Sequence, residues 1–250
     1  MTQAEVKFVR SLSLQKYRKE HNAYVIEGNK IVKEWLECKA PFRLLVATEQ
    51  WIEQHQLIVS RELEAKMRIV DPALLQKMSN FKTAGEVMAV VEMKEKHRHH
   101  FGKEGWTLVL DRVQDPGNMG TIIRTADWFG IPEVLYTPGS VELYNPKVIQ
   151  STMGSLLSVK SAEIMLENLL QNAQKTIWTT ALDGDSIYND TFPSVDAGYI
   201  VLGNESKGVD EDFLAKAMHK ISIPKYGRAE SLNVAIASAI ICSQIRSRKM

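Results

Sequence analysis

Hydrophobic positions between residues 106 and 250 form short, continuous apolar runs that alternate with stretches of helical period. Continuous runs are typical of strands buried on both faces of a parallel sheet, and apolar residues three or four positions apart are typical of helices packed against it. The expected strands are 107–110, 134–137, 176–182, 199–202 and 221–223, and the expected helices are 119–129, 146–153, 163–173, 210–218 and 232–245. This alternation predicts an α/β fold with a parallel sheet covered on both faces.

Residues 1–93 alternate in a similar but less regular way. The Asp71-Pro72 pair marks the start of one helix, because proline is favoured in the first turn. The expected strands are 24–27, 42–48, 68–70 and 86–93, and the other expected helices are 4–21, 29–37, 51–56 and 60–66. We therefore expect a second, smaller α/β domain in this part of the chain.

Residues 94–105 are charged, contain glycine and show no apolar period, which predicts a linker between domains 1–93 and 106–250. The linker contains His97, His99 and His100, a residue type that binds metals. No cysteine or carboxylate stands at a recognisable ligand spacing from these histidines, so we favour a solvated linker and expect no metal.

The composition changes this picture little, since 44% hydrophobic and 24% charged residues are ordinary for a soluble globular protein. No apolar run approaches the roughly 20 residues that span a bilayer, and residues 1–20 lack the apolar core of a signal peptide. Cys38 and Cys242 lie far apart in apolar surroundings. We interpret them as reduced core residues and expect a cytoplasmic protein without a membrane segment.

Positive charge is concentrated in the first part of the chain. Residues 1–100 carry 17 Lys and Arg against 13 Asp and Glu, a net charge of +4, whereas the remainder carries 14 against 17, a net charge of −3. Such a basic segment can neutralise RNA phosphates, although a solvated helix face would give the same pattern. The candidate RNA-binding residues are Lys7, Arg10, Lys16, Arg18 and Lys19.

Three polar loops follow predicted parallel strands, at 111–118, 203–208 and 224–231. The carboxyl ends of parallel strands meet at one edge of a sheet, where ligands usually bind. In the first loop Asn118 is placed to cap the following helix, and Arg124 lies almost two turns further along. A fixed guanidinium there suits a phosphate or carboxylate; the alternative is an arginine that lays its stem on apolar surface.

The second loop, LGNESKG, lacks the spacing of a phosphate-binding loop, and no G-x-G-x-x-G motif occurs in the chain. The third loop lies between an apolar strand stopped by Pro224 and an almost wholly apolar helix. This arrangement favours a ligand-binding loop, or else an ordinary strand-turn-helix unit in which Ser231 is the N-cap.

Three segments in order resemble the SpoU (TrmH) family of RNA ribose 2′-O-methyltransferases, within the SPOUT superfamily. They are LVLDRVQDPGNMGTIIRTADWFG at 108–130, IVLGNESKGVD at 200–210 and ISIPKYGRAESLNVAIASAI at 221–240. The segment QKYRKEHNAYVIEGNKIVKE also resembles the small RNA-binding domain of many members, which is similar to ribosomal proteins. The resemblance thus extends over nearly the whole chain and is weakest at 40–105.

This resemblance implies a catalytic domain with a C-terminal trefoil knot, S-adenosylmethionine bound in the knot, and a homodimer. The polar residues that match the family's functional positions are Asn118, Arg124, Glu205, Ser231 and Asn233. The residues that match its cofactor-binding loops are Leu202, Gly203, Asn204, Gly208, Ile223, Pro224, Ser231, Leu232 and Asn233. The apolar helix 232–245 independently favours a dimer, because one small domain does not readily cover it.

The implied function is S-adenosylmethionine-dependent methylation of a ribose 2′-hydroxyl in rRNA or tRNA, and the two-domain layout favours rRNA. Arg124 is then either the base or an electrostatic stabiliser, and the second role is favoured because a guanidinium rarely gives up its proton. Glu205 could instead cap the helix that begins near Asp210. A non-catalytic RNA-binding protein of the same fold and a small-molecule methyltransferase are the alternative functions.

Overall fold

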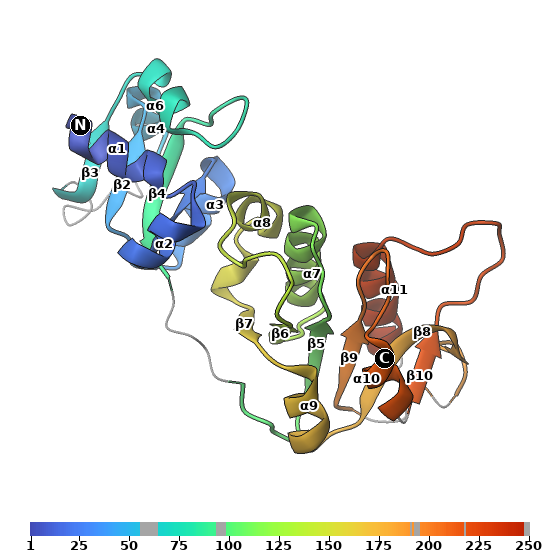
Figure 1. Cartoon of the computed structure of the whole chain (residues 1–250). Coiled ribbons are helices and arrows are strands. Elements are labelled where there is room, and N and C mark those ends of the chain that lie inside the picture. The colour runs from blue at the N-terminus through green and yellow to red at the C-terminus, as the bar shows by residue number, and fades with distance from the viewer. Residues whose placement is uncertain (56–64, 94–98, 191, 193–195, 218, 248–250) are drawn as a thin grey trace. The chain divides into compact units, whose positions relative to one another are not determined.

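The computed structural model describes residues 1–55, 65–93, 99–190, 192, 196–217 and 219–247. It divides the chain into two compact units (Figure 1). The first unit comprises residues 1–95 and 143–154, and the second comprises residues 96–142 and 155–250. Most of the predicted helix 60–66, the start of the predicted linker and His97 lie outside the described residues.

The first unit contains a four-stranded sheet of order β1-β4-β2-β3. Strand β4 is antiparallel to β1 and β2, whereas β3 is parallel to β2. The strands are β1 (Ala23–Glu27), β2 (Leu44–Ala47), β3 (Met67–Ile69) and β4 (Val87–Glu92). The helices are α1 (Gln3–Ser11), α2 (Gln15–His21), α3 (Asn29–Glu37), α4 (Glu49–Gln54), α6 (Pro72–Met78) and α8 (Pro146–Thr152).

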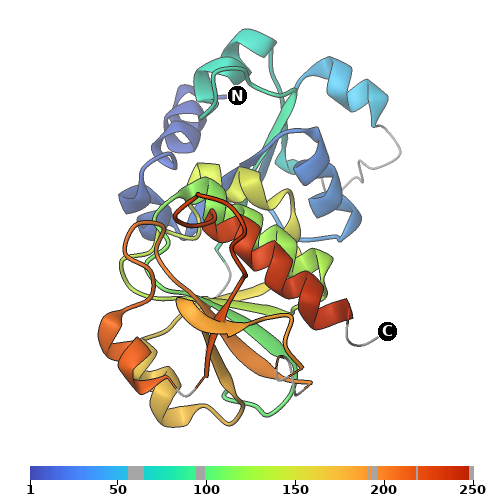
Figure 2. The same cartoon turned by 90° about the vertical axis from the view of Figure 1, so that its right-hand side faces the viewer.

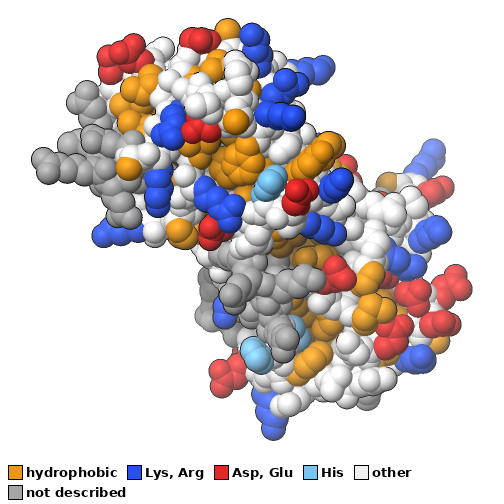
Figure 3. Space-filling model, turned by 60° about the vertical axis from the view of Figure 1, so that its left-hand side comes forward, with side chains coloured by type: hydrophobic (Ala, Val, Ile, Leu, Met, Phe, Trp, Pro, Cys, Tyr) orange, Lys and Arg blue, Asp and Glu red, His pale blue; other side chains and the backbone are white. Residues whose placement is uncertain are grey.

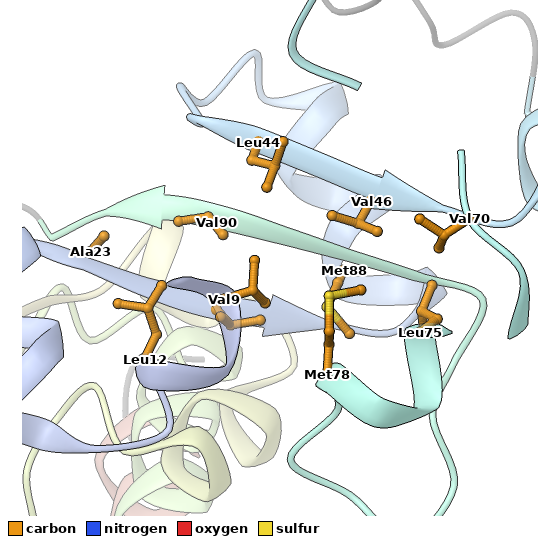
Figure 4. Close-up of a cluster of buried hydrophobic side chains, with 11 residues drawn as sticks. Val9, Leu12, Ala23, Leu44, Val46, Val70, Leu75, Met78, Met88 and Val90 are labelled. Carbon is orange, nitrogen blue, oxygen red and sulfur yellow. The ribbon is translucent and has the colours of Figure 1, made fainter. Parts of the chain in front are cut away.

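The core of the first unit lies between α1, α6 and one face of the sheet (Figure 4). Val9 and Leu12 at the end of α1 and Met78 of α6 pack against strand residues such as Val46 and Val90. Asp71 caps α6 by accepting a hydrogen bond from the backbone N–H of Leu74, with Pro72 in the first turn. The Asp-Pro pair therefore starts a helix as predicted.

The predicted single helix 4–21 is wrong, because the chain breaks between α1 and α2. Leu14 has extended backbone angles, φ −98° and ψ 133°, where a continuous helix would be required. The buried side chain of Leu12 packs into the core at this break. The guanidinium of Arg18 is also buried and donates to the carbonyl oxygens of Leu12 and Ser13 at 2.9 and 2.7 Å. These bonds satisfy backbone carbonyls that the break would otherwise leave unpaired.

The two cysteines differ from the prediction and from each other. Cys242 is buried, and burial raises its pKa to about 12. Cys38 is exposed, so its predicted place in the core is wrong. Cys38 is the C-cap residue of α3 and follows the last buried position of that helix, Leu36. It is thus carried past the apolar stripe into water.

The second unit contains a six-stranded parallel sheet of order β10-β8-β9-β5-β6-β7. The strands are β5 (Trp106–Leu110), β6 (Glu133–Tyr136), β7 (Lys160–Glu163), β8 (Ile177–Ser186), β9 (Gly198–Leu202) and β10 (His219–Ser222). The helices are α7 (Pro116–Trp128), α9 (Leu166–Asn172), α10 (Glu211–Lys216) and α11 (Val234–Ser247), with a 3₁₀ turn, η2 (Ser155–Leu157). The predicted parallel α/β architecture is confirmed.

Helices cover both faces of this sheet. Leu169 of α9 and Phe213 of α10 pack against Val109, Leu135 and Val201, which share one face of the strands. Helices α7 and α11 lie side by side on the other face (Figures 1 and 2). The loops at the start of α7, α10 and α11 therefore lie at the carboxyl ends of the strands, as expected for a ligand-binding edge.

The helix predicted for 163–173 begins too early, because residues 160–163 form the edge strand β7. Lys160 pairs with Glu133, and Glu163 pairs with Tyr136. Of the four residues of β7 only Ala162 is buried, so the segment contains no apolar run. An edge strand of this kind gives no hydrophobic signal in the sequence.

Two residues of the predicted linker, His99 and Phe101, pack against the second unit, whereas His100 and residues 102–105 are exposed as predicted. The His99 side chain is only 6% exposed, and its Nε2 lies 2.8 Å from the Tyr199 hydroxyl while its Nδ1 lies 2.8 Å from Glu133 Oε2. The Phe101 ring packs edge-on against His99 and contacts the adjacent hydrophobic core. Burial raises the pKa of the Tyr199 hydroxyl to about 12.

Among the described residues, no helix is long and apolar enough to cross a membrane.

Candidate active site

The loop 203–208 after β9 is closed by its own hydrogen bonds. Asn204 and Gly208 exchange backbone hydrogen bonds of 3.0 and 2.9 Å. The Asn204 side-chain oxygen accepts from the backbone N–H groups of Ser206 and Lys207, and its amide nitrogen donates to the carbonyl of Arg112 at 2.7 Å. The polar atoms of this side chain thus hold the loop rather than pointing toward a ligand.

Glycine is required at the first position of this loop. A Cβ atom at Gly203 would overlap the backbone of Gly208 and Val209. Gly208 has a φ of +69°, in the left-handed region that glycine tolerates best. The loop therefore forms a compact backbone wall directly after Leu202, the last residue of β9.

Helix α7 begins earlier than predicted, so the prediction that Asn118 is its N-cap is wrong. Asp115 is the N-cap, and its carboxylate accepts from the backbone N–H of Asn118 at 2.8 Å. Pro116 occupies the first turn. The Asp-Pro pair at 115–116 is the stronger start signal. Because Asp115 supplies the cap, the side chain of Asn118 is available for other contacts.

A chain of side-chain hydrogen bonds joins the three loops. The amide nitrogen of Asn233 donates to the side-chain oxygen of Asn118 at 2.9 Å. The amide nitrogen of Asn118 in turn donates to Glu205 Oε1 at 2.9 Å. We call these three residues the amide chain. It brings together three of the five predicted catalytic residues from positions far apart in the sequence.

Two alternatives from the sequence are wrong. Asn233, rather than Ser231, caps α11, since its side-chain oxygen accepts from the N–H groups of Ala235 and Ile236 at 2.9 and 3.3 Å. Asp210 caps α10 by accepting from the N–H groups of that helix's first turn, so Glu205 is not the cap. The Glu205 carboxylate therefore remains within the amide chain.

The other two predicted catalytic residues, Arg124 and Ser231, are not part of the amide chain. Arg124 is exposed on α7, on the same side as Trp128 one turn later. Its guanidinium makes no hydrogen bond or ion pair with any residue in the described part of the chain. Ser231 is also exposed. Neither side chain is oriented by the single chain alone.

A buried carboxylate beside the site escaped the sequence prediction. Asp111 follows β5 and accepts hydrogen bonds from the Arg112 guanidinium at 2.9 and 3.1 Å, from the Thr137 hydroxyl at 3.1 Å and from the Asp210 backbone N–H at 2.9 Å. These bonds tie the ends of β5 and β6 to the start of α10. The sequence signal that could have identified this cluster is the pair Asp111-Arg112 directly after the buried strand β5.

Two cavities lie away from the predicted cofactor loops. One, of about 270 Å³, borders the Asp111 cluster between α9 and α10. The other, of about 550 Å³, lies in the first unit beside Phe81 and Lys147. Neither is lined by residues of 203–208 or 223–233. Leu232 is 49% exposed and Ile223 and Pro224 are half-buried, so these residues form an open surface in the single chain.

The predicted cofactor-binding residues have a chemistry that fits S-adenosylmethionine. None of Leu202, Gly203, Ile223, Pro224 and Leu232 carries a charge. A neutral lining avoids stabilising the cationic sulfur in the ground state, which would slow methyl transfer.

The candidate RNA-binding residues of the first unit divide into two groups. Lys7, Arg10, Lys16 and Lys19 are exposed. Arg18 is buried and bonded to backbone carbonyls, so its predicted contact with RNA is replaced by a structural role. On the face shown in Figure 3, lysine and arginine side chains lie among acidic and apolar ones rather than in a single patch.

Comparison with known proteins yields two family matches. The SpoU rRNA Methylase family matches residues 105–243, and the MRM3-like substrate binding domain matches residues 3–89. A Bacillus subtilis protein named 23S rRNA (guanosine(2553)-2′-O)-methyltransferase RlmP is 31% identical over 247 residues, covering 97% of this chain and 96% of that protein.

Solved structures agree with these matches. A TrmH-family protein from Porphyromonas gingivalis is 35% identical with a TM-score of 0.85, covering 99% of each chain. An AdoMet-bound rRNA methyltransferase from Sinorhizobium meliloti is 26% identical with a TM-score of 0.84, covering 100% of this chain and 97% of that one. This chain therefore belongs to the SpoU rRNA methylase family.

Proposed function

We propose that this chain is a methyltransferase that uses S-adenosylmethionine to methylate a ribose 2′-hydroxyl of rRNA. The observation that carries the proposal is the amide chain, which joins the three polar loops of a SpoU methylase domain. The Bacillus subtilis relative is named as a 23S rRNA 2′-O-methyltransferase, and the Sinorhizobium meliloti neighbour is AdoMet-bound. The first supports the substrate class and the reaction, and the second supports rRNA and the cofactor.

The reaction is an in-line displacement in which the ribose 2′-oxygen bonds to a methyl carbon and the carbon–sulfur bond breaks. S-adenosylmethionine supplies that methyl group on a positively charged sulfur. The 2′-hydroxyl must pass its proton to water or to a base as the new bond forms, so negative charge develops on the oxygen. Arg124 is the residue we assign to this charge, since a guanidinium is a strong fixed donor and rarely loses its own proton.

The amide chain positions the loops for this reaction. Asn233 and Asn118 fix the start of α11 against the start of α7, and Glu205 is held by Asn118 at the edge of loop 203–208. Holding reacting groups in alignment is a large part of the rate enhancement that enzymes achieve. Ser231, next to this chain in sequence, is proposed to contact the cofactor or the target ribose.

We also propose a homodimer and a trefoil knot, the second on the family match alone. On the exposed sides of α7 and α11 lie Trp128, which is 85% exposed, and Ile236, which is 53% exposed. A second copy that covers these side chains would also lie beside Arg124, four residues before Trp128 on α7. The partner would then orient the guanidinium that a single chain leaves in water.

The first unit is proposed to hold the RNA through Lys7, Arg10, Lys16 and Lys19, which are exposed on α1 and α2. Contacts of this kind add salt-dependent affinity rather than sequence readout. The MRM3-like substrate binding domain match over residues 3–89 supports this division of labour.

Methyl incorporation from radiolabelled S-adenosylmethionine tests the function directly. The acceptor is 23S rRNA purified from cells that lack the gene, and the product is mapped for 2′-O-methylation. We expect one ribose to be labelled, and rRNA from wild-type cells, already modified, to accept little. Cofactor binding by calorimetry without any transfer to rRNA or tRNA would favour the non-catalytic alternative.

A further inference from the structure

The loop between β10 and α11 carries an aromatic ring that the fold leaves in water. Tyr226 is 93% exposed, the highest value among the large hydrophobic side chains of the described residues. Every residue from Lys225 to Asn233 is exposed, and Figure 1 shows this segment projecting beyond the body of the second unit. The ring therefore contributes no packing to the single chain and presents its faces to a partner.

Cationic side chains flank this ring. Lys225 and Arg228 are exposed and form no hydrogen bond or ion pair with another residue in the described ranges. Glu230 is the single acidic residue of the loop, so two cations stand against one carboxylate. An aromatic face between cations is the combination with which proteins bind single-stranded RNA, stacking a base and holding its phosphates.

The loop is tied to the candidate active site at both ends. Before Tyr226 come Ile223 and Pro224, which match the cofactor loop, and after it comes Asn233 of the amide chain. A base stacked on the ring would therefore belong to the methylated nucleotide or one beside it. The exposed apolar surface suited to a second copy lies instead on α7 and α11, at Trp128 and Ile236.

We propose that Tyr226 is a stacking platform for an unpaired base at or next to the methylated nucleotide, with Lys225 and Arg228 on the adjoining phosphates. This rests on the proposed function and adds a substrate-positioning residue to it. Stacking requires only the ring, so the Tyr226 hydroxyl is dispensable. The site selects unpaired RNA, because bases within a duplex do not offer a free face.

The test compares Tyr226→Ala and Tyr226→Phe with Tyr188→Ala, a matched change at a tyrosine that is 52% exposed elsewhere in the second unit. Filter binding measures affinity for 23S rRNA from cells lacking the gene, calorimetry measures S-adenosylmethionine affinity, and light scattering measures the molecular mass. Tyr226→Ala is expected to weaken RNA binding by roughly tenfold to a hundredfold, the range for one stacked base. Tyr226→Phe and Tyr188→Ala are expected to stay within about threefold of wild type.

The cations are tested by the salt dependence of RNA binding. Lys225→Ala and Arg228→Ala are each expected to reduce the slope of log affinity against log salt by about 0.7, the value for one phosphate of a single strand. An unchanged slope in both variants would remove the phosphate contacts from the proposal.

The other outcomes assign the ring differently and overturn the proposal. Unchanged RNA affinity in Tyr226→Ala would show that no base stacks there. A loss of cofactor affinity instead would place the ring over S-adenosylmethionine, and a halved mass would place it in a subunit interface. Failure of the proposed function is a separate result: wild-type protein that transfers no methyl group can still show the loss of RNA binding in Tyr226→Ala.

Discussion

The two halves of the candidate site differ in what holds them. Loop 203–208 and the amide chain are fixed by hydrogen bonds within the chain. Arg124 and residues 225–232 are exposed, and Arg124 has no partner within the described residues. We infer that the first half is built during folding, whereas the second half takes its working geometry from cofactor, RNA or a second subunit. Substitutions in the two halves should therefore act on different measured quantities.

The largest effect is expected from Arg124→Ala, in the half that the chain leaves open. Methyl transfer should fall by roughly two to four orders of magnitude, as when one preorganised electrostatic group is lost. The free energy of unfolding should change by less than about 0.5 kcal/mol, because the side chain is exposed. Single-turnover transfer and urea unfolding measure the two quantities.

Arg124→Lys should rescue little of that activity, because a point charge does not reproduce the guanidinium fork. Thr121→Ala, an exposed change on the same helix, is the matched control. Near-normal methyl transfer by Arg124→Ala would show that Arg124 has no catalytic role and only lies along the surface of the helix.

The next largest effect is expected from Asn204→Ala, in the half that the chain holds. The substitution removes three hydrogen bonds, each worth about 1 kcal/mol, so unfolding should become easier by about 3 kcal/mol. The measurement is urea unfolding, with Ser206→Ala as the control in the same loop. If Asn204→Ala and Ser206→Ala were equally stable, loop 203–208 would not be the fixed wall described above.

Asn233 connects the two halves, and two substitutions separate its roles. Asn233→Ala removes the N-cap of α11 and should cost about 1 kcal/mol of stability. Asn233→Asp keeps the capping oxygen but lacks the N–H that donates to Asn118, so stability should be retained. Both should weaken S-adenosylmethionine binding by about tenfold, equivalent to about 1.4 kcal/mol. Normal cofactor affinity in Asn233→Asp would show that the amide chain is not needed for the pocket.

The smallest expected effect is a difference in backbone hydrogen exchange between the two loops of the wild-type protein. Backbone amides of Asn204, Ser206, Lys207 and Gly208 are hydrogen-bonded and should exchange slowly, whereas those of 225–232 should exchange at close to the unprotected rate. Adding S-adenosylmethionine should slow exchange in 225–232 and change 204–208 little. Equal protection of both loops without cofactor would contradict the comparison.

The sequence predicted what depends on local periodicity. Continuous apolar runs such as 199–202 identified the central parallel strands, and the order of strands and helices identified the sheet. The edge strand β7 was missed, since burying one side chain of four gives no run. The α1–α2 break was missed because its stabilising partner, the buried Arg18, looked like one more surface cation.

The sequence predicted which residues belong to the site better than it predicted how they contact one another. Motif matching selected Asn118, Glu205 and Asn233, and the structure brings these three together. Their bonding pattern depends on which residue caps each helix, and nearby polar residues compete for that role. The cluster around Asp111 depends on contacts between distant segments, which no local pattern records.

The amide chain can be completed only late in the synthesis of the protein. Its members, Asn118, Glu205 and Asn233, are translated far apart, and domains fold as units while synthesis proceeds from the N-terminal side. The first unit's sheet uses strands that all precede residue 93, so it can form early. The hydrogen bond from Asn233 to Asn118 cannot form until Asn233 and α11 have been synthesised. With the first unit binding RNA as proposed above, a nascent chain on the ribosome would bind RNA before it has a complete site with which to modify it.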